Sequence, residues 1–285
     1  MPTVAIIGVG RVGGAISIAL SSGDNVVEHL IGKVSDISLG IITLDEIHTI
    51  SSDIVIISVN DDAIEAVSQE ISKKIAQSAV VLHTSGSLSS DVLSVVRDAG
   101  CSVGSMHPLA SISSSELGSE RFRGAYFCIE GDPRAIAVAS KLVKHLGGIE
   151  FTIPSTSKAL YHAAAVTASG HVTALIDLAA QMMNIAGVPA ENSLQILIPL
   201  IRSTIANISD QGTEVAITGP FARADIGVFE RQRASILTNL TYDEAEIYFN
   251  LARRSLRLAV ENGACKERVS ELDSMIRMAK NQLAK

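Results

Sequence analysis

Short apolar runs recur along the first half of the chain, each followed by a small polar cluster and then by a stretch with helical periodicity. The clearest runs are Val4–Ile7, Asp53–Val59, Ala79–Leu82 and Cys101–Gly104. Continuous apolar runs of this length are typical of strands buried on both faces of a parallel sheet. Their alternation with helices predicts an α/β fold with a Rossmann-like, doubly wound, mostly parallel sheet.

Weaker patterns complete this sheet. Further strands are expected at Asn25–Ile31, Gly40–Thr43, Ala125–Glu130 and Glu150–Ile153. Helices are expected at Val12–Ser22 with a stop at Gly23, and at Ala63–Ile75, Ser89–Ala99 and Pro133–Leu146. The serine-rich stretch Ser111–Gly118 has no periodic pattern, which predicts a loop.

From Ser155 onward the hydrophobic period is helical almost throughout. Helices are expected at Lys158–Ala186, Ala190–Asp210, Ala224–Asn239, Tyr242–Asn262 and Lys266–Leu283. A chain of 285 residues is long for a single core, which favours two domains. We therefore expect a sheet domain at residues 1–154 and an all-α domain at residues 155–285.

A glycine-rich loop follows the first apolar run. Gly8, Gly10 and Gly13 stand at G-x-G-x-x-G spacing between a predicted strand and a predicted helix. In a dinucleotide site the first glycine makes the turn, the second lets the pyrophosphate approach, and the third allows close helix packing. Arg11 and Val12 lie inside the loop, at a helix N-terminus that favours anions. The alternative is a glycine-rich turn that binds nothing.

Three other strands also end in small polar clusters. Ligands in a doubly wound sheet lie outside the carboxyl ends of the strands, so these clusters should share one cleft with the glycine loop. Each cluster alone is more typical of a helix cap or a turn. The residues expected to contact the cofactor there are Ser58, Val59, Asn60 and Thr84, with His107 on the substrate side.

The end of the second strand bears on the choice of cofactor. NAD-preferring sites carry an acidic residue there that binds the ribose 2′-hydroxyl. This chain has Lys33 instead, and no carboxylate before Asp36. A lysine would attract a 2′-phosphate, so NADP is favoured over NAD. The alternative for Lys33 is a solvated loop charge.

Composition excludes several classes of protein. The net charge is −7 and tryptophan is absent, so no basic face or aromatic platform indicates a nucleic-acid partner. Three cysteines lie far apart without metal-ligand spacing, so no metal site is expected and the thiols are expected to be reduced and mostly buried. The chain enters its first strand without a leader-like segment, and a cytoplasmic location is expected. The apolar stretch Ala163–Val188 is broken by polar residues, which predicts a core helix and not a membrane span.

The first helix of the second domain carries a polar stripe on a largely apolar surface. At 100° per residue, Lys158, His162, Ser169, Thr173 and Asp177 share one face. Lys158 and His162 stand four residues apart and could reach one bound oxygen, with the lysine polarising a carbonyl and the histidine passing a proton. The alternative is an exposed first-turn lysine and a hydrogen-bonded core histidine.

The helical domain is also the expected site of homodimerisation. The predicted helices Lys158–Ala186 and Leu194–Ile208 have little polar surface, and two-fold dimers are the commonest closed assembly.

Several separated motifs resemble one family. They are GVGRVGG from residue 8, NDDAI from 60, HTSGS from 83, MHPL from 106, YHAAAV from 161 and TGPFARAD from 218. The family comprises Rossmann-like proteins with an uncharacterised helical C-terminal domain, often described as NADP-dependent or deazaflavin-dependent oxidoreductases. It is similar in architecture to 3-hydroxyacid dehydrogenases, ketopantoate reductase and pyrroline-5-carboxylate reductase, in which a helical second domain completes the site.

The resemblance implies roles for particular residues. It implies that Ser85 lies near the nicotinamide and that Arg223 contacts an anionic group of the substrate. In the hydroxyacid dehydrogenase branch a catalytic lysine is followed four residues later by asparagine, where this chain has His162 after Lys158. Asn60 also replaces a frequent proline, and Gly170 replaces a frequent asparagine.

Together these features predict an NADP-dependent oxidoreductase acting on a small polar carbonyl, hydroxy or imine substrate. Two alternatives stay open. One is a non-catalytic NADP-binding regulator or sensor, and the other is a deazaflavin-dependent reductase that passes hydride to NADP.

Overall fold

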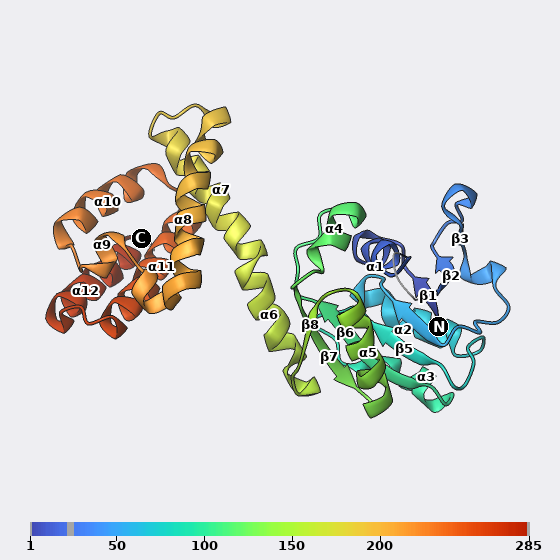
Figure 1. The fold of residues 1–285 in the computed structure, drawn as a ribbon. Coiled ribbons are helices and arrows are strands. Elements are labelled where there is room, and N and C mark those ends of the chain that lie inside the picture. The colour runs from blue at the N-terminus through green and yellow to red at the C-terminus, as the bar shows by residue number, and fades with distance from the viewer. Residues whose placement is uncertain (1, 22–25, 284–285) are drawn as a thin grey trace. The chain divides into compact units, whose positions relative to one another are not determined.

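An eight-stranded sheet organises the first half of the chain in the computed structural model, which describes residues 2–21 and 26–283 (Figure 1). Its strand order is β3-β2-β1-β4-β5-β6-β7-β8. The strands are β1 (Thr3–Ile7), β2 (Val26–Ile31), β3 (Ile41–Ile42), β4 (Ile54–Ile57), β5 (Val80–His83), β6 (Ser102–Pro108), β7 (Tyr126–Gly131) and β8 (Ile149–Thr152). All neighbours pair in parallel except β6 and β7. The predicted mostly parallel sheet is confirmed.

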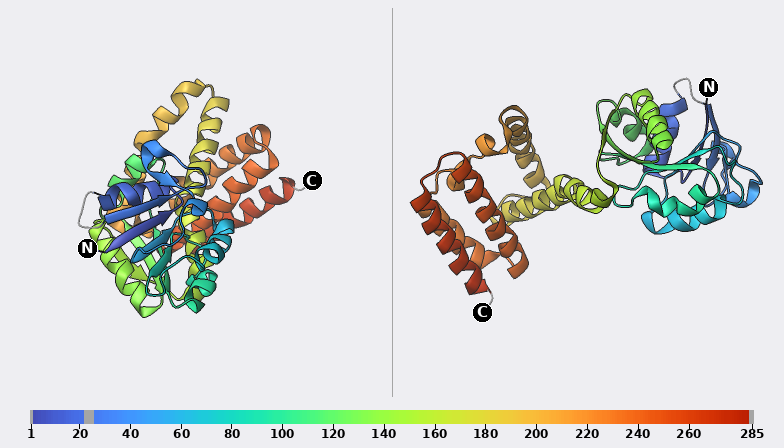
Figure 2. Two further views of the ribbon diagram at one scale, coloured as in Figure 1. Left: turned by 90° about the vertical axis from the view of Figure 1, so that its right-hand side faces the viewer. Right: turned by 90° about the horizontal axis from the view of Figure 1, so that it is seen from below.

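Helices cover both faces of this sheet (Figures 1 and 2). The strands are apolar throughout because successive side chains enter opposite layers: Ile54 and Ile56 of β4 join one buried cluster, and Val55 and Ile57 join the other. The first layer contains α1 (Arg11–Ser21), α4 (Ser115–Arg121) and α5 (Pro133–His145), and the second contains α2 (Asp61–Ile71) and α3 (Ser94–Asp98). The predicted end of the first helix at Ser22 and Gly23 lies outside the described residues.

Two local predictions for this sheet were wrong. The loop predicted over Ser111–Gly118 contains the start of α4, because the Ser114 side chain accepts a hydrogen bond from the Leu117 amide and caps the helix. Strand β6 runs to Pro108 and not to Gly104, because its second half pairs with the antiparallel β7. His107 therefore stands on a strand and not in a loop.

The chain divides into two compact units, residues 1–171 and 172–285. The first unit includes α6 (Lys158–Ala168), which the expected boundary at residue 154 would assign to the second. The regular structure described in the second unit is helical (Figure 2). It comprises most of α7 (Gly170–Ile185), then α8 (Ala190–Ala216), α9 (Gly219–Ala222), α10 (Ile226–Asn239), α11 (Tyr242–Glu261) and α12 (Lys266–Leu283). Its core joins α10, α11 and α12 through Phe229, Phe249, Leu256, Leu272 and Ile276.

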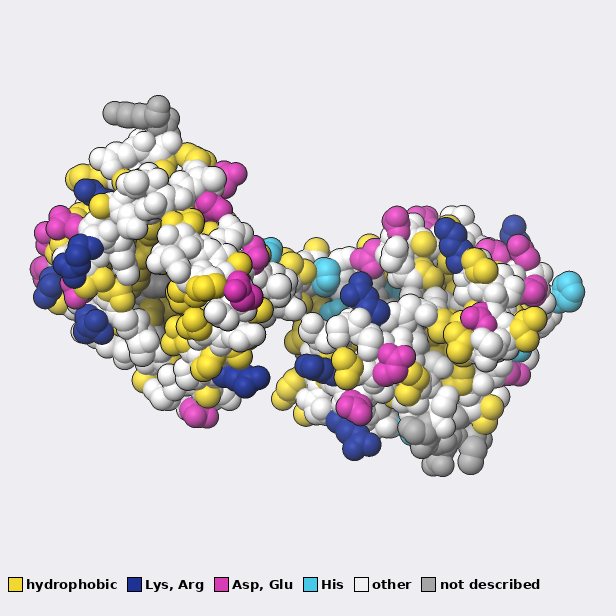
Figure 3. Space-filling model, turned by 90° about the horizontal axis from the view of Figure 1, so that it is seen from above, with side chains coloured by type: hydrophobic (Ala, Val, Ile, Leu, Met, Phe, Trp, Pro, Cys, Tyr) yellow, Lys and Arg dark blue, Asp and Glu magenta, His cyan; other side chains and the backbone are white. Residues whose placement is uncertain are grey.

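The predicted helix Lys158–Ala186 breaks at Ser169, where φ is −124° and ψ is −75°. The prediction of a core helix was wrong, because α7 contains no buried residue within the described chain. Hydrophobic side chains are instead exposed in groups on the helical unit (Figure 3). Length and composition alone would let residues 155–185 cross a membrane, with a mean hydropathy of 1.3. However, this run includes Lys158, whose side chain is buried against the sheet.

Candidate active site

A cavity of about 560 Å³ lies where β1, β4, β5 and β6 end. Four strand ends contribute to its wall, as expected for parallel neighbours in one sheet. The lining residues are Gly10, Arg11, Val12, Ser58, Val59, Asn60, Asp61, Thr84, Ser85, Gly86, His107, Pro108, Ala110, Ile112 and His162. The polar clusters that the sequence placed at these ends therefore lie together.

The glycine loop has the shape of a phosphate cradle. Gly8 has a φ of 95°, and a Cβ there would lie 2.4 Å from the Ser58 carbonyl oxygen, so only glycine fits. A Cβ on Gly13 would lie 2.0 Å from the Gly8 carbonyl oxygen, which explains how α1 approaches the loop so closely. A Cβ on Gly10 would meet nothing within 4 Å, so open space borders the backbone there. The first amides of α1 face no partner within their own helix. These features fit the pyrophosphate of a dinucleotide.

The loop after β5 is held by its own hydrogen bonds. His83 is fully buried, and its Nδ1 accepts from the Ser85 amide at 3.2 Å. Its Nε2 therefore carries the proton and donates to the Ser89 carbonyl at 3.2 Å. Burial lowers the pKa of His83 to about 4, which agrees with this neutral form. The Ser85 hydroxyl oxygen accepts from the amides of Ser87 and Leu88, so it caps the turn while it lines the cavity.

Lys158 ties α6 to two of these strand ends. Its side chain is 1% exposed, and its Nζ donates to the Ser85 carbonyl at 2.9 Å and to the Ser105 hydroxyl at 3.1 Å. Both acceptors are neutral oxygens, and burial lowers the pKa of Lys158. Lys158 lines neither this cavity nor the second cavity described below. The structure therefore does not place its ammonium group where it was predicted to contact a bound carbonyl. The lysine instead holds the loop after β5 in place.

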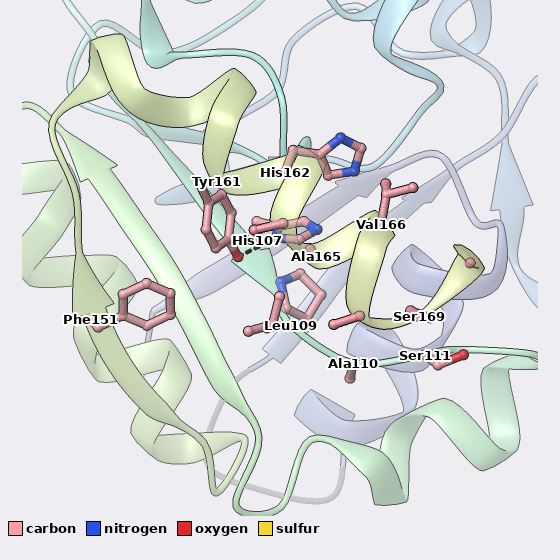
Figure 4. Close-up of a pocket in the computed structure, with 14 residues that line it drawn as sticks. His107, Leu109, Ala110, Ser111, Phe151, Tyr161, His162, Ala165, Val166 and Ser169 are labelled. Atoms are coloured by element: carbon pink, nitrogen blue, oxygen red, sulfur yellow. Dashed lines mark hydrogen bonds between the residues drawn. The ribbon is translucent and has the colours of Figure 1, made fainter. Parts of the chain in front are cut away.

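A second cavity, of about 740 Å³, lies between the end of β6 and α6 (Figure 4). It shares His107, Pro108, Ala110 and His162 with the first cavity, so the two meet at these residues. Its remaining lining residues are Leu109, Ser111, Phe151, Tyr161, Ala164, Ala165, Val166, Ala168, Ser169 and Gly170. Two histidines therefore mark the junction.

Three rings, those of His107, Tyr161 and His162, form a cluster at this junction. His107 Nδ1 lies 2.7 Å from the Tyr161 hydroxyl oxygen (Figure 4). The centroid of the His107 ring lies 5.6 Å from that of Tyr161 and 5.8 Å from that of His162, and both contacts are edge-on. Burial, reinforced by Lys158 and His162, lowers the pKa of His107 to about 4. Burial also raises the pKa of Tyr161, so the histidine and the phenol are both neutral at pH 7.

Gly86 allows the two histidines to approach the loop. A Cβ on Gly86 would lie 2.5 Å from Cδ2 of His162 and 2.8 Å from Nε2 of His107. Neither Gly86 nor Tyr161 was among the predicted site residues. Both stand inside motifs noted from the sequence, HTSGS and YHAAAV, but neither residue type announces a site by itself.

The other predicted residues lie in different places. Lys33 is exposed and lies two residues beyond the end of β2. The carbonyl of Ile31, the last residue of β2, accepts a hydrogen bond from the Gly8 amide at 2.8 Å. The end of β2 therefore lies beside the glycine loop. Arg223 belongs to the second unit, at the C-terminal end of α9, and its anion contact stays a prediction. Among the described residues, no group of three or more histidine, cysteine, aspartate or glutamate side chains could hold a metal ion.

Residues 125–255, from the strand pair β7–β8 to most of α11, match the model of a family described as Domain of unknown function (DUF2520). This segment carries Tyr161 and His162. The match agrees with the Rossmann-like family with a helical C-terminal region that the motifs resemble. No curated protein sequence matches the chain.

Solved structures share the architecture of the whole chain. A Bacteroides fragilis protein provisionally described as an NADP oxidoreductase is 20% identical, with a TM-score of 0.73 over 90% of this chain and 98% of its own. A Thermotoga maritima protein is 26% identical, with a TM-score of 0.67 over 89% and 98%. Plasmodium falciparum pyrroline carboxylate reductase with NADP bound is 13% identical, with a TM-score of 0.58 over 90% and 98%. These similarities establish the fold.

The buried position of Lys158 predicts its contribution to stability. Lys158→Ala would leave the Ser85 carbonyl and the Ser105 hydroxyl without their donor and would open a cavity where the aliphatic stem lay. We expect the free energy of unfolding to fall by about 2–4 kcal/mol in urea titrations followed by circular dichroism. Lys141→Ala, at an exposed position on α5, is the matched control and should change it by less than about 0.5 kcal/mol. Equal effects of the two substitutions would contradict the role assigned to Lys158.

Proposed function

We propose that the protein is an NADP-dependent oxidoreductase that moves a hydride between the nicotinamide and the carbonyl, hydroxyl-bearing or imine carbon of a small molecule. The observation that carries the proposal is the meeting of a glycine-lined cavity and a second cavity at His107 and His162. A cofactor in the first cavity would present its reactive ring to a substrate in the second. The descriptions of the Bacteroides and Plasmodium neighbours, which name NADP, support this choice.

Different residues of the chain would bind different parts of the cofactor. Gly8, Gly10, Arg11, Val12 and Gly13 would hold the pyrophosphate at the start of α1. Ser58, Val59, Asn60 and Thr84 would face the ribose and nicotinamide side, where Thr84 donates to the Ser58 hydroxyl at 3.1 Å. Lys33 would bind the 2′-phosphate. When bound, NADP supplies or accepts the hydride.

His107 is the proposed hydrogen-bond donor to the substrate. A phenol is a stronger donor than a neutral imidazole, and an imidazole nitrogen is a stronger acceptor than a phenol oxygen, so Tyr161 donates to His107 Nδ1. The remaining proton then sits on Nε2, the nitrogen that faces Gly86. This N–H stabilises negative charge that develops on the substrate oxygen or nitrogen. His162, which lines both cavities, transfers the proton, and Ser85 shapes the loop beside the nicotinamide.

The second cavity favours an enzyme over a regulator that only senses NADP. A sensor needs the glycine loop, but it has no second ligand to occupy a cavity of about 740 Å³ beside the proposed cofactor site. No feature of the described residues favours a deazaflavin as the second partner.

We also propose that the protein is a homodimer formed through α7 and α8. No residue of α7 is buried, and α8 buries only Ser193 and Ala216. Exposed apolar side chains recur along α8 at Leu194, Ile196, Leu200 and Ile205. The same helix carries charged residues such as Arg202 and Asp210. A protein surface can form ion pairs with these side chains and the hydrocarbon of a membrane cannot, so a protein partner is favoured over lipid.

Cofactor preference tests the role of Lys33. Lys33→Ala removes the cation proposed for the 2′-phosphate, so we expect the Kd for NADPH to rise about tenfold and the Kd for NADH to change less than about twofold. Isothermal titration calorimetry measures both. Lys73→Ala, another exposed lysine, should leave both unchanged. A wild-type protein that binds NADH more tightly, or a variant that loses both cofactors equally, would refute the assignment.

The pH profile tests the pairing of Tyr161 with His107. Because the pKa of His107 is about 4, this histidine does not titrate between pH 6 and 8. It should therefore cause no change in the wild-type rate of NADPH oxidation over that range. Tyr161→Phe frees Nδ1, allows the proton to move there, and should lower kcat on the order of tenfold at pH 7. As the pH falls through the His107 pKa, the imidazolium regains an Nε2 proton and kcat should recover.

Nitrogen-15 NMR of the histidine rings gives a readout of the same pairing that does not depend on turnover. The wild-type His107 should be protonated at Nε2, and Tyr161→Phe should show a mixture of tautomers. The exposed Tyr126→Phe is the control for loss of a hydroxyl group. An unchanged tautomer in Tyr161→Phe would show that Tyr161 does not set it.

Sedimentation tests the proposed dimer. The wild-type protein should sediment as a dimer at micromolar concentration. Leu200→Glu places a charge in each copy's apolar face and should weaken association at least about tenfold. Met278→Glu, an exposed apolar position on α12, should leave association unchanged. A monomeric wild-type protein would exclude the proposal.

A further inference from the structure

We propose that the substrate is an uncharged and largely apolar molecule, with its carbonyl or imine end at His107 and His162 and its body in the 740 Å³ cavity. This inference rests on the proposed oxidoreductase function and names the substrate class of the same site. It departs from the polar, anion-bearing substrate that the sequence suggested.

The walls of the cavity lack charge. None of its 14 lining residues is lysine, arginine, aspartate or glutamate. Leu109, Phe151 and Val166 contribute large apolar side chains (Figure 4). A carboxylate that became buried among them would lose hydration without gaining a cation, which is unfavourable. The wall therefore selects against anionic substrates.

Two cations of the first unit that lie near this region, Lys158 and Arg11, have other partners or positions. Lys158 is buried and donates to Ser85 and Ser105, and it does not reach the cavity wall. Arg11 lines the glycine-loop cavity, where the proposed pyrophosphate needs it. The neighbouring His107 is a neutral ring, because its pKa is about 4. A substrate carboxylate would find no positive partner among these groups.

Polar groups are concentrated at the junction. His107, Tyr161 and His162 are joined there by a 2.7 Å hydrogen bond and an edge-on ring contact. One polar end and an apolar body is the complement of a substrate with a single carbonyl or imine group on a hydrocarbon frame. The hydroxyl group of Ser111 is neutral and suits an ether, ester or alcohol farther along the molecule.

The room for such a body comes from small residues on α6. Ala164, Ala165 and Ala168 line the cavity, where longer side chains would fill it. A volume of about 740 Å³ lies within the range of sites for small organic ligands. The cavity also continues into the glycine-loop cavity through four shared residues, which favours a substrate over a docked protein segment as its occupant.

Paired substrates of equal length test the inference. Methyl ketones from 2-butanone to 2-octanone are compared with the 2-oxo acids of the same chain length, with NADPH as reductant. We expect kcat/KM for the ketones to rise about fourfold per added methylene, which is the burial of one CH₂ group. We expect 2-oxooctanoate to be at least about 100-fold poorer than 2-octanone. A preference for the oxo acid would overturn the inference.

Matched variants locate the effect. Ala168→Leu fills the cavity and should abolish the gain with chain length while leaving the Kd for NADPH unchanged. Ala163→Leu makes the same change on α6 outside the cavity and should preserve the gain. If Ala168→Leu alters only the oligomeric state and not the chain-length dependence, the cavity holds a second copy of the chain and the inference is wrong.

Binding separates failure of this inference from failure of the proposed function. If NADPH binds but no compound is reduced, the oxidoreductase proposal fails, and calorimetric titration of 2-octanone and 2-oxooctanoate into the NADP⁺-loaded protein then decides the substrate class. Tighter binding of the ketone, with affinity that grows with chain length, supports an apolar ligand. Tighter binding of the acid, or no binding of either, refutes it.

Discussion

A buried ammonium group without an ionic partner sets the arrangement of the site. Lys158 begins α6, and its Nζ reaches the carbonyl of Ser85 and the hydroxyl of Ser105, so one side chain joins a helix to the ends of β5 and β6. The positions of the α6 side chains at the junction follow from that placement. Tyr161 and His162 stand three and four residues further along the helix, one turn beyond the lysine, which brings both rings to His107.

The two cavities that meet there differ in their electrostatics. The glycine-loop cavity has a helix N-terminus and Arg11 on its wall, and so suits a highly charged ligand. Across the histidines the wall becomes neutral and apolar. Burial keeps both His107 and Tyr161, which lie at this boundary, uncharged. A reaction that moves a hydride between ligands in these cavities would take place where the polarity changes.

Local pattern was sufficient for the sheet and for most of the helices. Continuous apolar runs identified β4 and β5 because both faces of these strands are covered, and the glycine spacing located the loop after β1. The same patterns placed the polar strand ends in one cavity, because parallel neighbours end at one edge. The break at Ser169 and the capped start of α4 were missed, because each depends on backbone geometry or on one side-chain hydrogen bond. The polar stripe from Lys158 to His162 indicated that this helix borders a site. Periodicity cannot distinguish a lysine whose side chain enters a cavity from one whose side chain is buried against the strand ends, as that of Lys158 is. Tyr161 was missed for a related reason, since its importance comes from a partner 54 residues away on β6.

The break at Ser169 has a consequence for how such a protein can diversify. Both cavities are lined by residues 10–170, all within the first compact unit. The proposed cofactor site and the wall proposed to select the second ligand therefore lie in one continuous segment, which ends close to the break. The core around Phe229 and Phe249 shares no residue with either cavity, so a substitution in α6 can change a cavity wall without altering that core. Sequence change in one unit can therefore leave the packing of the other intact.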